Sequence, residues 1–94
     1  MRARPIVTID RELRILALEI DEEAGRWPPS IQRLDVMRAA GQIRLIHTFV
    51  MRGIVSRGCG ELWIQVGRDQ LLRWAGIRAA ILELNPDPDL PAGD

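Results

Sequence analysis

The sequence predicts a small, mainly α-helical domain, and three observations lead to that prediction. Apolar residues recur at helical spacing over most of the 94-residue chain. Proline and glycine clusters divide this pattern into segments of helix length. Only residues 61–66 alternate between apolar and polar side chains as a strand does. We therefore expect one domain over residues 1–85, built from three to four helices and one short strand or hairpin.

The first helix is predicted at about residues 10–24. Its apolar residues lie three and four positions apart and form one stripe: Leu13, Leu16, Ala17, Ile20 and Ala24. Ile15 and Leu18 lie on a different side, where they form a second, smaller apolar patch. Gly25 can end the helix, and the prolines of Trp27-Pro28-Pro29 keep the chain from continuing as a helix.

The central segment, residues 31–57, is predicted to be one long helix or two helices joined near Gly41. Its many β-branched residues favour a strand. A projection at 100° per residue instead gathers its main apolar residues and His47 within about a third of the circumference, with no charged residue among them. These are Val36, Ala39, Ala40, Ile43, Ile46, His47, Val50 and Ile54. Ser30 is positioned to cap this helix, and a second apolar patch indicates a central element: Ile31, Leu34, Leu45 and Phe49.

Residues 61–66 are predicted to be a short strand after a turn at Gly58-Cys59-Gly60. Leu62, Ile64 and Val66 occupy one face of that strand, and Trp63 lies on the opposite, polar face. The strand needs a partner, for which the sequence leaves three alternatives. They are residues 6–9, residues 52–57, and the same strand of a second subunit.

The last helix is predicted at residues 68–84. Its apolar residues nearly encircle it, so neighbouring elements must cover most of its surface. They are Leu71, Leu72, Trp74, Ala75, Ile77, Ala79, Ala80, Ile81, Leu82 and Leu84. Asn85-Pro86 ends the helix. Residues 86–94 hold three acids and three prolines, counting Pro86, and are expected to form a disordered, acidic, proline-rich tail.

The chain offers no spacing typical of a catalytic or metal site. His47 is the lone histidine and lies in the apolar stripe, where a structural role is expected, with no second ligand four residues away. Cys59 lies between two glycines, and we expect a structural thiol. Asp21, Glu22 and Glu23 are interpreted as a solvated or partner-paired acidic patch. We therefore predict a non-enzymatic protein that needs neither metal nor cofactor.

Charge is balanced overall but segregated along the chain. Thirteen basic residues, all of them arginine, match thirteen acidic ones. Residues 10–23 hold six acids and two arginines (−4), whereas residues 24–58 hold six arginines and one acid (+5). Within the basic segment four arginines span less than half of the central helix, which is typical of a nucleic-acid face: Arg33, Arg38, Arg44 and Arg52. Pairing with the acidic first helix, or exposure to solvent, is the alternative interpretation.

The apolar surface exceeds what three helices of a monomer can cover. We therefore expect a homodimer or an obligate protein partner. The predicted interface residues are Trp63, Trp74, Ile77, Ile81, Ile15 and Leu18. The predicted function is a non-enzymatic protein–protein interaction or regulatory module, and the alternative is a small nucleic-acid-binding regulator.

Three further expectations concern the setting of the protein. A composition with arginine and no lysine is typical of a GC-rich genome, so we expect a bacterial or phage origin. The chain lacks about 18 uninterrupted apolar residues, so no membrane association is expected. One cysteine excludes an internal disulfide framework, which favours the cytoplasm.

Overall fold

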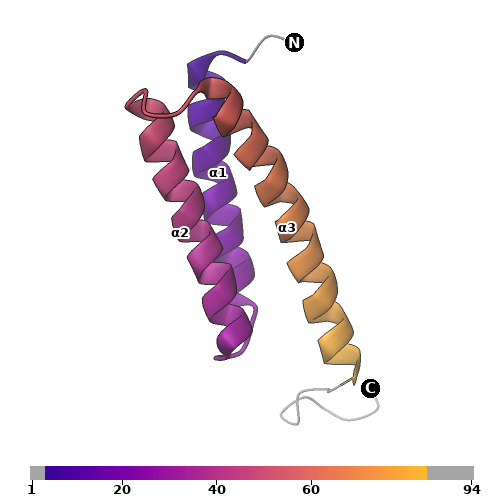
Figure 1. The fold of residues 1–94 in the computed structure, drawn as a ribbon. Coiled ribbons are helices and arrows are strands. Elements are labelled where there is room, and N and C mark those ends of the chain that lie inside the picture. Colours follow the sequence, from indigo (N-terminus) through magenta and orange to yellow (C-terminus); the bar gives the residue numbers. More distant parts are fainter. Residues whose placement is uncertain (1–3, 85–94) are drawn as a thin grey trace.

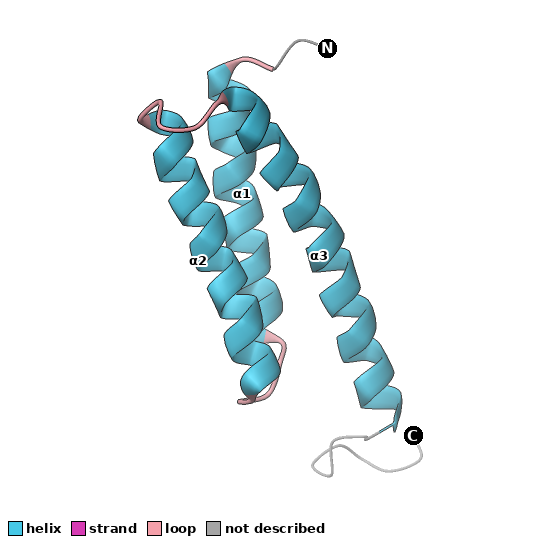
Figure 2. Ribbon diagram, in the orientation of Figure 1, coloured by secondary structure: helices cyan, strands magenta, loops and turns pink. Residues whose placement is uncertain are grey.

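The computed structural model describes residues 4–84 and contains three α-helices within that range. They are α1 (Ile6–Gly25), α2 (Ile31–Met51) and α3 (Arg57–Leu84). The chain runs down α1, up α2 and down α3, as Figure 1 is drawn. Figure 2 shows only helices and loops in this range, so the mainly helical class is confirmed.

Helix α1 begins earlier than the sequence predicted. Pro5 occupies the N-cap position, and its carbonyl oxygen accepts hydrogen bonds from the amides of Thr8 and Ile9 at 3.0 and 3.2 Å. The fixed φ of proline suits the start of a helix. Ile9 is fully buried as a result, and the predicted stripe that follows it is buried too: Leu13, Leu16, Ala17, Ile20 and Ala24.

Helix α2 is one unbroken helix. Ser30 caps it as predicted, since its Oγ accepts a hydrogen bond from the Arg33 amide at 3.1 Å. Gly41 lies inside the helix on its exposed side and causes no break. The helix ends at Met51, whereas the prediction extended it to residue 57. Gly53, with a φ of 70°, turns the chain there, because such a dihedral angle suits glycine.

The predicted strand at residues 61–66 is wrong, because this segment lies inside α3. The cluster Gly58-Cys59-Gly60 forms the first turn of that helix. The hydroxyl oxygen of Ser56 accepts a hydrogen bond from the Cys59 amide at 3.1 Å and caps it. Trp63 therefore has no strand face to occupy. It is half-buried and packs against the core.

Two glycines of upper α3 (residues 57–67), Gly60 and Gly67, allow that part of the helix to approach the α1–α2 hairpin closely. A Cβ at Gly60 would lie 3.0 Å from Ile9 Cγ2, and a Cβ at Gly67 would lie 2.5 Å from Leu16 Cδ2. Between them, Ile64 is buried. After Gly67 none of the described residues of α3 is buried, and the helix diverges from the hairpin towards its C-terminus (Figure 1).

Within residues 4–84, no helix combines the length and the apolar character that crossing a membrane requires. The predicted acidic tail, residues 86–94, lies outside the described residues.

Candidate interaction surface

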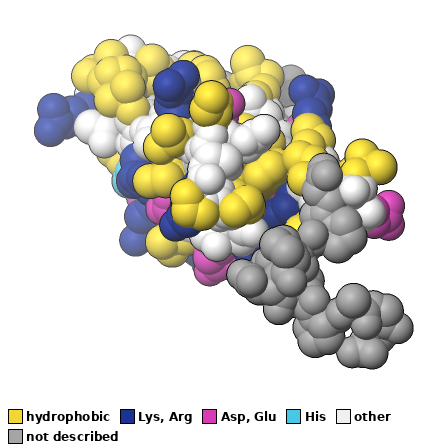
Figure 3. All heavy atoms as spheres, turned by 90° about the horizontal axis from the view of Figure 1, so that it is seen from below, with side chains coloured by type: hydrophobic (Ala, Val, Ile, Leu, Met, Phe, Trp, Pro, Cys, Tyr) yellow, Lys and Arg dark blue, Asp and Glu magenta, His cyan; other side chains and the backbone are white. Residues whose placement is uncertain are grey.

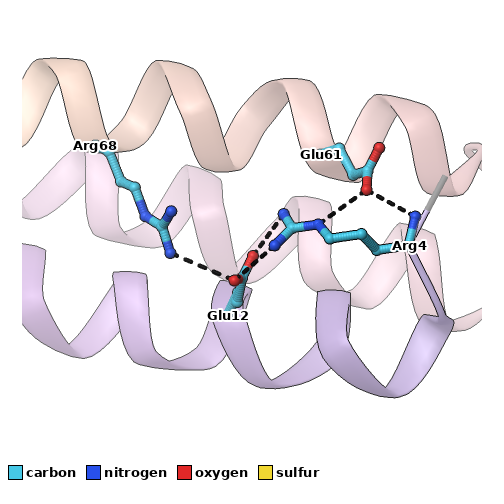
Figure 4. Close-up of polar contacts among 4 residues, drawn as sticks. All are labelled: Arg4, Glu12, Glu61 and Arg68. Carbon is cyan, nitrogen blue, oxygen red and sulfur yellow. Dashed lines mark hydrogen bonds and ion pairs between the residues drawn. The ribbon is translucent and has the colours of Figure 1, made fainter. Parts of the chain in front are cut away.

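A network of four charged residues joins the start of α1 to the upper part of α3 (Figure 4). The Arg4 guanidinium lies 2.6 Å from Glu12 Oε2 and 3.0 Å from Glu61 Oε1. The Arg4 amide also donates to Glu61 at 2.8 Å. This backbone hydrogen bond, followed by the side-chain one, lowers the pKa of Glu61 below its usual range. Arg68 completes the network at 3.6 Å from Glu12.

A second charged group ties α1 to α3 near the lower end of the bundle. The side chain of Glu23 is acidic, yet only 1% of the residue's surface is exposed. Arg78 of α3 donates to both of its oxygens, at 2.6 and 3.2 Å, and the Trp27 indole donates at 3.0 Å. Burial raises the pKa of Glu23, but the hydrogen bonds and charge of Arg78 and the hydrogen bond from Trp27 together lower it by more. The pKa of Glu23 therefore lies below its usual value.

Two further pairs connect α1 and α2. His47 Nε2 lies 2.5 Å from Asp10 Oδ1, and this contact lowers the pKa of Asp10. Arg44 donates to Asp21 at 2.7 Å. The half-buried His47, for which a structural role was expected, has a side-chain carboxylate of α1 as its partner. Each of these polar groups fixes one helix against another.

The described part of the chain contains no group of three or more histidine, cysteine, aspartate or glutamate residues arranged to hold a metal ion. Cys59 is half-buried at the start of α3.

The four arginines proposed for nucleic-acid contact differ in their surroundings. Arg44 is paired with Asp21 of the acidic first helix. The Arg33 guanidinium lies 3.5 Å from the Trp27 carbonyl oxygen. Arg38 and Arg52 are exposed, and neither forms an ion pair within residues 4–84. The structure thus commits two of the four to contacts within the chain.

The six predicted interface residues fall into three groups. Trp63 and Trp74 are half-buried against the core. Ile77 and Ile81 are exposed on lower α3, and Ile77 keeps 44% of its surface accessible. Ile15, at 45%, and Leu18 are exposed on α1. The predicted interface is therefore divided between two helices.

Seven residues of α3 form an exposed line that sequence reasoning did not single out. At 100° per residue they fall within about 80° of the helix circumference, and every one is exposed. We call them the outer stripe: Leu62, Val66, Asp69, Arg73, Ile77, Ala80 and Leu84. The signal was the three- and four-residue spacing, which becomes visible only when residues 57–84 are taken as a single helix.

Apolar surface is also exposed at other places. Seen from below, several hydrophobic patches lie between charged side chains at the lower end of the bundle (Figure 3). One shallow hollow at the start of α2 is mainly apolar and is lined by Pro29, Ser30, Ile31, Arg33, Leu34 and Met37. Helix α3 nevertheless differs from the other two helices, because it combines many exposed apolar residues with little contact to the core.

No protein-family model, no curated protein and no solved structure matches this chain. A functional proposal therefore rests on the residues described above.

Proposed function

We propose that this protein is a non-enzymatic protein–protein interaction module that acts as a homodimer, and that α3 is its dimerisation element. One observation carries the proposal. Beyond Gly67, α3 extends for 17 residues, 68–84, without burying any of them, although it bears many large apolar side chains. Leu72 and Leu84 keep 74% and 80% of their surface accessible. A helix with this much uncovered apolar surface is typical of an interface.

The energetics of burial support a second copy as the cover. Complete burial of one leucine or isoleucine side chain contributes about 1.5–3 kcal/mol. Covering several of them therefore contributes a free energy comparable with the total stability of a small domain, which is about 5–15 kcal/mol. Because both copies of a homodimer present the same helix, a single interface covers this apolar surface on each copy.

The proposed setting follows from the sequence. A single cysteine, half-buried at the start of α3, fits a reducing compartment, so we place the protein in the cytoplasm. The absence of lysine supports a bacterial or phage source, and a small dimer of this kind suits a regulatory role.

The alternative function, nucleic-acid binding, receives less support. Arg33 and Arg44 already have partners within the chain, and the hollow beside Arg33 is mainly apolar. Binding to DNA or RNA with a steep salt dependence, lost in Arg38→Ala/Arg52→Ala, would favour this alternative.

Sedimentation equilibrium at tens of micromolar tests the proposal. We expect a mass of about twice the 10.6 kDa of one chain. Ile77→Glu should dissociate the dimer, whereas Ile15→Glu should not. These two isoleucines form a matched pair, because their exposed fractions are 44% and 45% and they lie on different helices. A folded wild-type monomer, or equal effects of the two variants, would contradict dimerisation through α3.

A further inference from the structure

The outer stripe of α3 carries one acidic and one basic residue, with apolar residues on both sides of them. Leu62 and Val66 precede the two charged residues, and three apolar residues follow them: Ile77, Ala80 and Leu84. Asp69 and Arg73 have opposite charges and are four residues apart, so the midpoint between them is position 71. A line that carries one charge of each sign, with apolar residues on both sides of them, can complement itself when one copy is reversed.

The two charged residues of the outer stripe, Asp69 and Arg73, form few polar contacts within the described part of the chain. Asp69 accepts one hydrogen bond, from Gln65 at 3.3 Å, in an exposed position. Arg73 forms no ion pair with any residue between 4 and 84. Although they are four residues apart on one helix, Asp69 and Arg73 do not pair with each other. Both are therefore available to a partner.

We propose that two copies pair through their outer stripes in antiparallel orientation, with the two-fold axis at residue 71. This inference rests on the proposed homodimer and specifies its geometry. In this register Asp69 of each copy lies opposite Arg73 of the other. A parallel, in-register pairing would instead place Asp69 against Asp69 and Arg73 against Arg73, which repel.

The same register places three large side chains of the outer stripe opposite small residues, and it places Ile77 level with Gln65. Leu62 lies level with Ala80 of the other copy, and Val66 lies level with Gly76. Leu84 lies level with Gly58. Both glycines are exposed, and a Cβ built at Gly76 would meet nothing within 4 Å. The backbone there leaves room for a side chain of the second copy, which allows two helices to pack closely.

Charge reversal tests the pairing. Asp69→Arg and Arg73→Asp each place like charges opposite one another at two points, so each variant alone should dimerise roughly 10- to 100-fold more weakly at low salt. An equimolar mixture of the two variants should form a heterodimer, because every opposing pair is then complementary. The double variant should regain the wild-type dissociation constant.

Matched controls are available on α2. Asp35→Arg and Arg38→Asp make the same changes of charge at exposed positions outside the outer stripe, and they should leave the dissociation constant within about twofold of wild type. Circular dichroism of each variant verifies that the helices persist.

The orientation has a separate readout at the single cysteine. In the antiparallel pairing, spin labels on Cys59 of the two copies are separated by 24 residues along the helix, or roughly 36 Å. Parallel helices would bring the labels to roughly 10 Å. A dipolar distance near 36 Å supports the proposal, and a distance near 10 Å overturns it.

The outcomes separate this inference from the proposed function. A dimeric wild type whose affinity is unchanged by Asp69→Arg and Arg73→Asp would overturn the outer-stripe pairing and leave the homodimer standing. A monomeric wild type at tens of micromolar would overturn both. Weakened single variants that associate when mixed would support both.

Discussion

The two halves of α3 face the α1–α2 hairpin in different ways. The upper half, residues 57–67, presents Gly60, Ile64 and Gly67, and all three are buried. The lower half, residues 68–84, presents Leu71, Trp74 and Arg78 on the same side, and none of them is fully buried. One continuous helix thus begins as part of a bundle and ends as a largely uncovered arm.

The difference follows from side-chain size. Without a Cβ, glycine lets two helices approach until backbone meets side chain, whereas tryptophan and arginine hold them apart. The alternating four- and three-residue spacing of Gly60, Ile64 and Gly67 continues below with larger residues, so α3 is held away from the hairpin there (Figure 1). Beyond Arg68, which lies 3.6 Å from Glu12, the Arg78–Glu23 pair is the polar link between lower α3 and α1. Complete burial ends where the small residues end, and below them Leu71 and Trp74 are only partly buried against the core.

The largest expected effect comes from truncating one isoleucine to alanine in each half of α3 and comparing the losses of stability. Ile64→Ala removes a side chain that is 2% exposed, so we expect the free energy of unfolding to fall by about 2–4 kcal/mol. Ile77→Ala, on the outer stripe, should cost under about 0.5 kcal/mol in the monomer. Guanidinium chloride unfolding in dilute protein, where dimerisation does not contribute, measures both. Equal losses would mean that lower α3 is packed as tightly as upper α3.

An intermediate effect is expected at the polar link. Arg78→Met leaves the buried Glu23 carboxylate with Trp27 and a longer contact to Arg26, so we expect a loss of about 2–3 kcal/mol at pH 7. Arg38→Met is the control, because Arg38 is exposed without an ion pair in the described region. It should cost under about 0.5 kcal/mol.

The pH dependence of that loss gives a second check. In the wild type the pKa of Glu23 is lowered, so its contribution is complete above the unfolded value of about 4.3 and is lost as the pH falls through the folded value. In Arg78→Met only Trp27 and Arg26 offset the effect of burial, so the pKa of Glu23 in the folded state rises. The difference in stability between the two proteins should therefore shrink from pH 7 to pH 4. A difference that is constant over this range would show that Arg78 acts through packing alone.

Much of the fold could be predicted from the sequence. The helical period located α1 and α2, Trp27-Pro28-Pro29 marked the connection between them, and Ser30 was identified as a cap. These features depend on neighbours in sequence, which is why they are readable there. The exposed Ile77 likewise follows from a helix that is apolar nearly all round.

The errors concern features that depend on a second helix. Residues 61–66 alternate in polarity, but they also fit the three- and four-residue spacing of the helix in which they lie. Gly60 was interpreted as part of a turn, and the last helix was predicted to begin just after Gly67, whereas both glycines lie inside α3 at contacts with α1. A glycine in a sequence signals a turn and a close helix contact equally, and only the partner helix distinguishes them. Dividing α3 at Gly67 also concealed the outer stripe.

The smallest expected effects come from replacing two glycines of α3 with alanine, one that contacts α1 and one that does not. Alanine gains up to about 1 kcal/mol over glycine inside a helix. At Gly76, where a Cβ would contact nothing within 4 Å, Gly76→Ala should therefore stabilise the monomer by about 0.5–1 kcal/mol. At Gly67 the new Cβ would lie 2.5 Å from Leu16 Cδ2 and 3.3 Å from Ile43 Cδ1, and Leu16 is buried. Overpacking costs about 1–3 kcal/mol, so Gly67→Ala should destabilise by about 1 kcal/mol after the helical gain. Opposite shifts in thermal midpoint are expected, and shifts of the same sign would show that close contact with α1 does not limit residue size at Gly67.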